Sequence, residues 1–153
     1  MDAVQLLEDD HKSVEDLFGR YEEADQEAYK DKRQLVDRVI KELSVHATIE
    51  EEIFYPATRE ARGETEQMIA EAYQEHAKAT RTLAELETME AEDPRFDQTV
   101  RSLIADVRHH VEEEESEMFP EVQQLLSKEE LESLGEQMRE AKMSAPQKPS
   151  EVA

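Results

Sequence analysis

The chain has 153 residues, enough to bury a real core, and its three glycines and five prolines amid abundant Glu, Ala, Leu, Gln and Lys favour an all-helical protein. Its 40 acidic against 18 basic residues give a formal net charge of −22, so neither nucleic acid nor an anionic membrane is an expected partner. The absence of cysteine excludes disulfides, thiolate metal sites and cysteine nucleophiles. No leader peptide is visible, and no apolar run approaches the roughly 20 residues that span a bilayer, which favours a cytoplasmic protein.

Hydrophobic periodicity predicts two long amphipathic helices in the first half of the chain. The first covers about residues 2–25 and has Asp2 as its candidate N-cap. The second covers about residues 31–61. Pro56 lies inside it and is not expected to end it, with a kink at this position as the alternative. Gly63 marks the turn that follows.

The second half of the chain repeats this organisation. A third helix is predicted over about residues 65–89, and a loop ending in Asp93-Pro94 separates it from a fourth over about 95–125. Ser127-Lys128-Glu129-Glu130 fits a capping box, which predicts the start of a short fifth helix.

These elements predict an all-α fold, an up-down-up-down four-helix bundle with a short C-terminal fifth helix. The bundle would occupy residues 1–126 and the fifth helix residues 127–143. The tail at 144–153 has two prolines and one large apolar residue, so it is predicted to be disordered.

A metal-ligand pattern occurs twice on these helices. In each copy a His precedes a Glu by four positions and a Pro by ten. The copies are His46-Ala47-Thr48-Ile49-Glu50, followed by Pro56, and His110-Val111-Glu112-Glu113-Glu114, followed by Pro120. Because residues four apart share one face of a helix, each copy presents an imidazole and a carboxylate side by side.

Each copy also has a lone histidine one helix upstream. His11 lies 35 residues before His46, and His76 lies 34 residues before His110. All four fall on the apolar stripes that a bundle turns inward. Together with the two Glu residues they supply four nitrogens and two carboxylates able to bridge, which predicts a dinuclear metal site.

Each residue alone has an ordinary structural explanation. A lone buried His is usually hydrogen-bonded in the core, and Glu112–Glu115 alone is typical of a solvated acidic face. The residues Phe54, Tyr55, Tyr73 and Met118 are expected to serve core packing rather than metal binding. Taken together, however, four His and two Glu inside a bundle need strong compensation, because an unpaired buried carboxylate costs several kcal/mol. A divalent metal supplies it.

The register of the second copy requires a choice, since His109 and Glu113 have the same spacing. His110 shares its face with apolar residues such as Val107, and only His110 aligns with His46 relative to the proline. We therefore assign His110 and Glu114 as the inward pair. His109 is expected to be exposed, or at most a neighbour of the site.

The types of donor atom narrow the choice of metal. Imidazole with bridging carboxylates suits iron, and also manganese or zinc. Structural zinc prefers closed tetrahedral sites that are usually rich in cysteine, which fits poorly. Ferritin-like bundles use Glu-x-x-His, whereas this chain has His-x-x-x-Glu, which argues against a ferritin-type ferroxidase.

The six residues, in this order and register, resemble the hemerythrin family in its HHE cation-binding branch, over about residues 2–126. The resemblance implies a four-helix bundle that holds two non-haem iron ions, ferrous or ferric, joined by an oxo or hydroxo bridge. The implied ligands are Glu50 and Glu114 as bridges, His11 and His46 on one iron, and His76 and His110 on the other.

Two departures from oxygen-carrying hemerythrins argue against reversible oxygen carriage. Carriers have a further His one turn before the ligand of the third helix, where this chain has Ala72. Carriers also place an Asp five residues after the last His, whereas Glu114 follows His110 by four. We infer that Ala72 leaves an extra position on the iron of His76 and His110. Tyr73 could reach that position, although ordinary packing is its first explanation.

Three classes of function follow. The first is a module that binds or reacts with O2 or a related small ligand, peroxide or nitric oxide. The second is a catalase-like redox enzyme that decomposes peroxide at the same centre. The third is an interaction module, in which metal stabilises the bundle and the fifth helix engages a partner. The highly charged outward faces favour a monomer.

Overall fold

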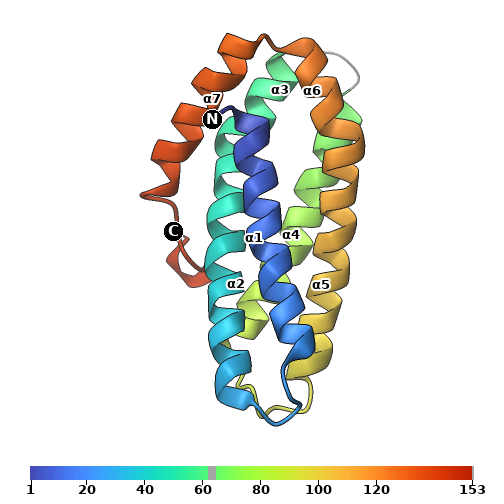
Figure 1. Cartoon of the computed structure of the whole chain (residues 1–153), viewed down its shortest axis with the longest axis vertical. Coiled ribbons are helices and arrows are strands. Elements are labelled where there is room, and N and C mark those ends of the chain that lie inside the picture. Colours follow the sequence, from blue (N-terminus) through green and yellow to red (C-terminus); the bar gives the residue numbers. More distant parts are fainter. Residues whose placement is uncertain (62–64, 153) are drawn as a thin grey trace.

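The computed structural model describes residues 1–61 and 65–152, whose helices run alternately down and up (Figure 1). Four rods form the bundle: α1 (Ala3–Glu23); α2 (Tyr29–Ile49) with η1 (Glu50–Phe54) and α3 (Tyr55–Ala61); α4 (Glu66–Thr88); and α5 (Phe96–Glu113) with η2 (Glu114–Met118) and α6 (Phe119–Leu125). The fifth helix is α7 (Lys128–Lys142). These residues include no strand, and the all-α up-down-up-down prediction is confirmed.

The helix starts follow the predicted caps. The Asp2 carboxylate accepts the backbone N–H of Gln5 at 2.8 Å, as an N-cap should. Ser127 and Glu130 form the reciprocal capping box, with N···O distances of 3.1 and 3.0 Å. The turn predicted at Gly63 lies outside the described residues.

Both copies of the His-x-x-x-Glu motif widen into a π-helical turn. The backbone N–H of Tyr55 donates to the carbonyl of Glu50, and that of Phe119 donates to Glu114, five residues back in each case. The prolines explain the position of the widening, because a proline ring clashes with the carbonyl four residues before it in an α-helix. Pro56 does not end the helix, which continues to Ala61 through the π turn.

The core consists of two apolar clusters separated by a polar layer. One cluster lies toward the α1–α2 loop and includes Phe18 and Leu103, and the other includes Ile49 and Phe119. The buried histidines and two glutamates occupy the layer between them. The polar layer therefore sits inside the bundle, held by apolar packing on both sides.

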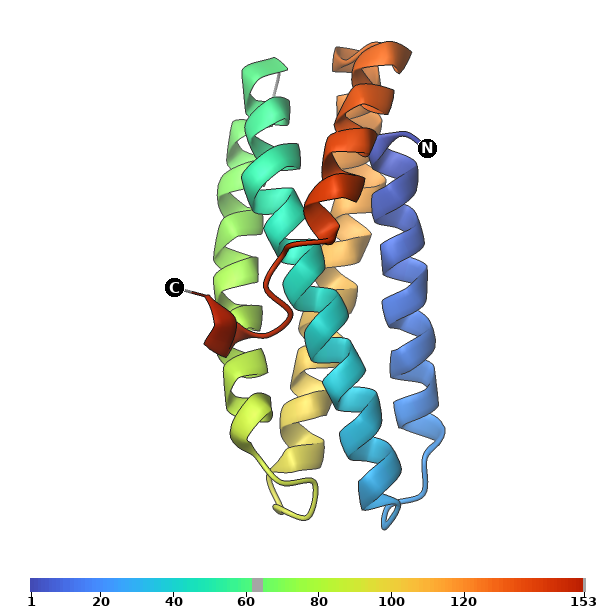
Figure 2. The same cartoon turned by 90° about the vertical axis from the view of Figure 1, so that its left-hand side faces the viewer.

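The α7 helix folds back over the bundle beside α1 and α2 (Figure 2). It approaches the start of α1 at Gly135, where an added Cβ would lie 2.3 Å from the carbonyl oxygen of Met1. At its end, Lys142 Nζ donates to Asp10 Oδ1 at 2.5 Å. The fifth helix is thereby tied to α1 at two points.

Beyond α7, a 3-10 turn at Pro149–Glu151 lies near α4, where the Ser150 N–H donates to Glu87 Oε1 at 3.1 Å. The disorder expected for residues 144–153 stays a prediction, as does the division at residue 126, and limited proteolysis would test both. None of the helices described here combines the length and apolar character needed to cross a bilayer.

Candidate metal centre

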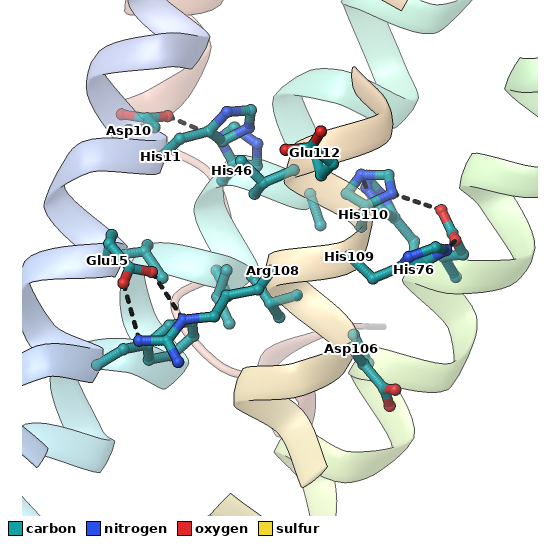
Figure 3. A pocket seen from close by; sticks show the side chains of 18 of the residues that line it. Asp10, His11, Glu15, His46, His76, Asp106, Arg108, His109, His110 and Glu112 are labelled. Atoms are coloured by element: carbon teal, nitrogen blue, oxygen red, sulfur yellow. Dashed lines mark hydrogen bonds and ion pairs between the residues drawn. The ribbon is translucent and has the colours of Figure 1, made fainter. Parts of the chain in front are cut away.

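The six residues predicted as metal ligands come together in the polar layer, and each is at most 9% exposed. His11 lies on α1, His46 and Glu50 on α2 and η1, His76 on α4, and His110 and Glu114 on α5 and η2. Figure 3 shows the four imidazoles as two pairs, His11 with His46 and His76 with His110. The ring centroids within the pairs are 5.0 and 4.9 Å apart.

Each carboxylate joins the two pairs of imidazoles. Oε1 of Glu50 lies 3.2 Å from His46 Nε2 and 3.1 Å from His76 Nε2. Oxygens of Glu114 lie 3.1 Å from His11 Nε2 and 3.3 Å from His110 Nε2. Each Glu thus reaches one His of either pair, which is the placement that a bridging carboxylate requires.

The half-site of His11 and His46 contains buried polar atoms that lack hydrogen bonds within the described part of the chain. They are His11 Nε2, His46 Nε2, Glu50 Oε2 and Glu114 Oε1. His11 Nε2 and Glu114 Oε1 are close together, but their geometry does not make a hydrogen bond. Such orphaned donors and acceptors are costly in a core, and a cation placed among them would satisfy them all.

The half-site of His76 and His110 contains a hydroxyl group from Tyr55. This hydroxyl donates to Glu114 Oε2 at 2.5 Å and lies 3.2 Å from Glu50 Oε1. It is also 3.2 and 3.4 Å from the Nε2 atoms of His76 and His110, which are themselves 3.2 Å apart. Tyr55 therefore belongs to the site, whereas the sequence predicted packing only.

The π turn explains why helical periodicity misses Tyr55. In an α-helix a residue five positions after Glu50 lies off its face, but the wider turn brings position 55 back above it. The signal in the sequence is the proline ten residues after each His. In the second copy the equivalent residue is Phe119, which stacks on His11 with centroids 5.8 Å apart and offers no hydroxyl.

Tyr73, the tyrosine considered for this position from the sequence, donates instead to the backbone carbonyl of Glu51 at 3.0 Å. Its ring packs edge-on against Tyr55, with centroids 5.4 Å apart. Ala72 is buried beside them in the same apolar cluster. Tyr73 therefore packs against the Tyr55 ring, and its hydroxyl is held by the backbone of Glu51.

Every buried imidazole turns its other nitrogen, Nδ1, toward a second carboxylate at the edge of the site. The pairs are Asp10 with His46 (2.9 Å), Glu51 with His76 (3.2 Å), Glu75 with His110 (2.7 Å) and Glu115 with His11 (2.7 Å). We call these four residues the outer carboxylates. Such partners fix the proton on Nδ1 and leave Nε2 free to bind a metal.

The outer carboxylates close a ring around the bundle. Each is the chain neighbour of a predicted ligand but pairs with a histidine of another rod. The carboxylate on α1 contacts a histidine on α2, the one on η1 contacts α4, the one on α4 contacts α5, and the one on η2 contacts α1. None of these four residues was predicted from the sequence as a hydrogen-bond partner of a histidine. Consecutive side chains on a helix point in different directions. When a ligand points into the centre, its chain neighbour therefore points toward the adjacent helix and contacts a histidine there.

The buried carboxylates dominate the electrostatics of the site. Burial alone would lower the pKa of His46 and His110, but nearby carboxylates outweigh it and raise these values to about 10 and about 12. Burial favours the neutral form of Glu50, yet the charge of His46 and several hydrogen bonds hold its pKa well below the usual range. Protons and a metal cation are alternative ways to balance these carboxylates.

The donor atoms fit metal ions on distance as well. Ligand atoms of His11, His46, Glu50 and Glu114 all lie within 4.8 Å of one another, and so do those of Glu50, His76 and His110. The two groups share Glu50. Their imidazole and carboxylate donors suit a first-row divalent metal.

A cavity of about 620 Å³ borders all four imidazoles on the side toward the α1–α2 loop (Figure 3). Its inner wall is apolar and includes Phe18, Leu83 and Val107, while charged residues such as Asp106 and Glu112 also line it. A small molecule therefore has a route from the surface to the histidines.

Residues 2–122 match the hemerythrin HHE cation binding domain. The chain belongs to this family. It is accordingly a metal-binding helical protein, as the hemerythrin resemblance implied, with a buried His/Glu cluster able to hold metal.

Two further similarities place this hemerythrin-like chain among known proteins. The crystal structure of a hemerythrin HHE cation binding domain-containing protein from Mycobacterium kansasii aligns with a TM-score of 0.78 and 28% identity, over 94% of this chain and 86% of that one. A Nostoc protein named DNA nickase is 28% identical over 148 residues, or 97% of this chain. The chain spans 41% of the length of that relative.

Proposed function

We propose that the protein holds two non-haem iron ions and reacts there with O2 or a related small ligand, peroxide or nitric oxide. His11 and His46 would bind one iron, His76 and His110 the other, and Glu50 and Glu114 would bridge them. A bound iron pair would supply a two-electron redox centre.

The observation that carries the proposal is the set of orphaned atoms between His11 and His46. In a core this well packed, two imidazole nitrogens and two carboxylate oxygens without hydrogen bonds in the described chain need a partner. A metal cation is the partner that accepts electron pairs from both kinds of atom. Family membership supports the same conclusion.

The side chains around the centre would prepare it for such chemistry. The outer carboxylates hold Nδ1–H groups outward, so that the Nε2 electron pairs point inward. The apolar wall of the cavity limits water near the histidines. Tyr55 holds a proton at Glu114 Oε2, within reach of one half-site only.

Decomposition of peroxide is the second candidate, and the Tyr55 hydroxyl favours it. A neutral hydroxyl in contact with His76 and His110 is a proton donor placed beside one metal position. Burial, followed by the charges of Glu50 and Glu114, raises the pKa of Tyr55 well above its usual range, so the proton is held at neutral pH. Oxygen evolution from added hydrogen peroxide would distinguish turnover from simple binding.

The first experiment is anaerobic loading with ferrous iron, followed by iron analysis and visible spectra before and after air is admitted. We expect about two irons per chain and a new absorption band on oxidation, and a band that reverses under vacuum would indicate binding rather than turnover. A Glu50→Gln, Glu114→Gln double variant should lose stoichiometric iron. Unchanged iron binding by that variant would rule out the proposed ligands.

We propose further that nucleic acid is not a partner, despite the name of the Nostoc relative. The net charge of −22 opposes binding to phosphates, and the shared region is 41% of that protein. The iron-loaded protein should leave a supercoiled plasmid intact when catalase is present. Nicking that persists with catalase would contradict this proposal.

A further inference from the structure

His109 stands next to the buried His110 but projects from the outer face of α5, where its side chain is 66% exposed. Its Nε2 lies 2.5 Å from Glu113 Oε1 and 3.9 Å from Glu75 Oε2. His109 and Glu113 repeat the His-x-x-x-Glu spacing one residue out of register with the buried pair. On α5, therefore, one His-x-x-x-Glu pair faces the core and the other faces outward.

Glu75 brings a second helix to this group. Its Oε1 accepts the Nδ1–H of His110 at 2.7 Å, which leaves Oε2 turned toward His109. One ligand atom from each of Glu75, His109 and Glu113 lies within 4.8 Å of the other two. Two rigid helices therefore hold an imidazole and two carboxylates at distances that a single ion can span.

The charges of this group are not balanced by its own residues. Two carboxylates face one imidazole, whose Nε2 can donate to only one of them at a time. Lys78, which lines the same cavity, pairs with Asp106 at 3.1 Å. A bound cation would balance both carboxylates while taking the electron pair of the imidazole.

We propose that Glu75, His109 and Glu113 form a third, outer site for a divalent first-row transition metal cation. One nitrogen and two carboxylate groups leave room for water ligands, a set suited to zinc, manganese or ferrous iron. The site stands on its own residues and requires no metal in the buried centre.

The position of the outer site gives it a role in metal entry. His109 and Glu75 line the cavity that also borders the four buried imidazoles. Glu75 touches both sites, one oxygen on His110 and the other toward His109. A cation bound at the outer site therefore lies at the cavity that leads to the buried metal centre.

The test is a count of bound zinc by equilibrium dialysis at micromolar Zn²⁺ and physiological salt. Three full-length proteins are compared: the unaltered chain, a His109→Gln, Glu113→Gln double variant, and Glu117→Gln. Glu117 is exposed on the same rod, and its substitution changes the net charge by the same amount. Circular dichroism establishes that the variants fold.

We expect the double variant to bind one zinc ion fewer than the unaltered chain, and Glu117→Gln to lose none. Equal stoichiometry in the double variant and the unaltered chain would overturn the outer site. If the unaltered chain binds one ion and the double variant none, the outer site stands and the buried centre fails. If both bind two ions, the reverse holds.

A second measurement addresses metal entry. With cobalt as the spectroscopic probe, uptake into the buried centre should slow several-fold in the double variant but keep its final amplitude. Uptake at the rate of the Glu117→Gln control would contradict the entry role.

Discussion

At the scale of single residues, Tyr55 marks the difference between the two halves of the centre. Its hydroxyl contacts the carboxylates and imidazoles of one half-site, whereas the equivalent residue at the other half-site, Phe119, has no hydroxyl. The six predicted ligands follow from spacing on helix faces, because that periodicity survives up to each Glu. The position of Tyr55 in the site does not follow from this spacing, because it depends on a π turn that α-helical periodicity does not predict.

Tyr55→Phe should destabilise the protein without bound metal by about 1–3 kcal/mol, because buried acceptors lose their donor. The metal-loaded protein should lose less, since a cation satisfies the same acceptors. Urea unfolding with and without zinc measures both values. Tyr73→Phe is the matched control: it also removes one hydroxyl, but from a bond to the backbone carbonyl of Glu51. Equal effects in both states would contradict the role given to Tyr55.

The outer carboxylates should control metal affinity from a distance. Asp10→Asn keeps the size of the side chain but weakens its hold on the Nδ1–H of His46, so we expect metal affinity to fall about 10–100-fold. Competition with a chromophoric chelator measures the change. Asp16→Asn serves as the control, because Asp16 is exposed and pairs with Arg20 on the same helix. An unchanged affinity in Asp10→Asn would mean that His46 is positioned by packing alone.

At the scale of elements, the predicted helices agree with the observed ones where caps and periodicity are strong. The capping box at Ser127 and the N-cap at Asp2 gave the correct starts of α7 and α1. What the sequence could not supply was the interior of the second and fourth rods, where each proline forces a π turn instead of an end. It also could not show where α7 docks, because that contact joins residues far apart in the chain.

Two glycines provide a matched test of that docking. At Gly135 an added Cβ would meet the backbone of residues 1–3, so Gly135→Ala should destabilise the protein as α7 is pushed off α1. At Gly19 an added Cβ meets no described atom within 4 Å, so Gly19→Ala should stabilise α1 by up to about 1 kcal/mol. Thermal unfolding measures both. Shifts of the same sign would contradict the docking geometry.

At the scale of the whole molecule, the net charge of −22 and the buried polar layer both oppose folding, and metal relieves the second. A cation that binds only the folded state adds about 2.7 kcal/mol when its free concentration is 100 times Kd. We therefore expect chelation to lower the unfolding temperature by several degrees.

Magnesium at the same ionic strength is the control for this experiment, since it screens the acidic surface but binds imidazole poorly. Equal stabilisation by magnesium and by zinc or iron would mean that surface charge, rather than the buried centre, is responsible.

The ring of outer carboxylates carries a consequence for symmetry. Each hairpin, residues 1–61 or 65–125, holds two of the imidazoles, one central carboxylate and two outer ones. One of its outer carboxylates contacts the second histidine of the same hairpin, and the other contacts a histidine of the opposite hairpin. A hairpin is thus self-complementary: two identical copies about a two-fold axis would offer the same donors. Such a dimer could have two tyrosine hydroxyls or none. Joining two unequal hairpins in one chain is what allows a single hydroxyl, and hence two pairs of histidines with different surroundings.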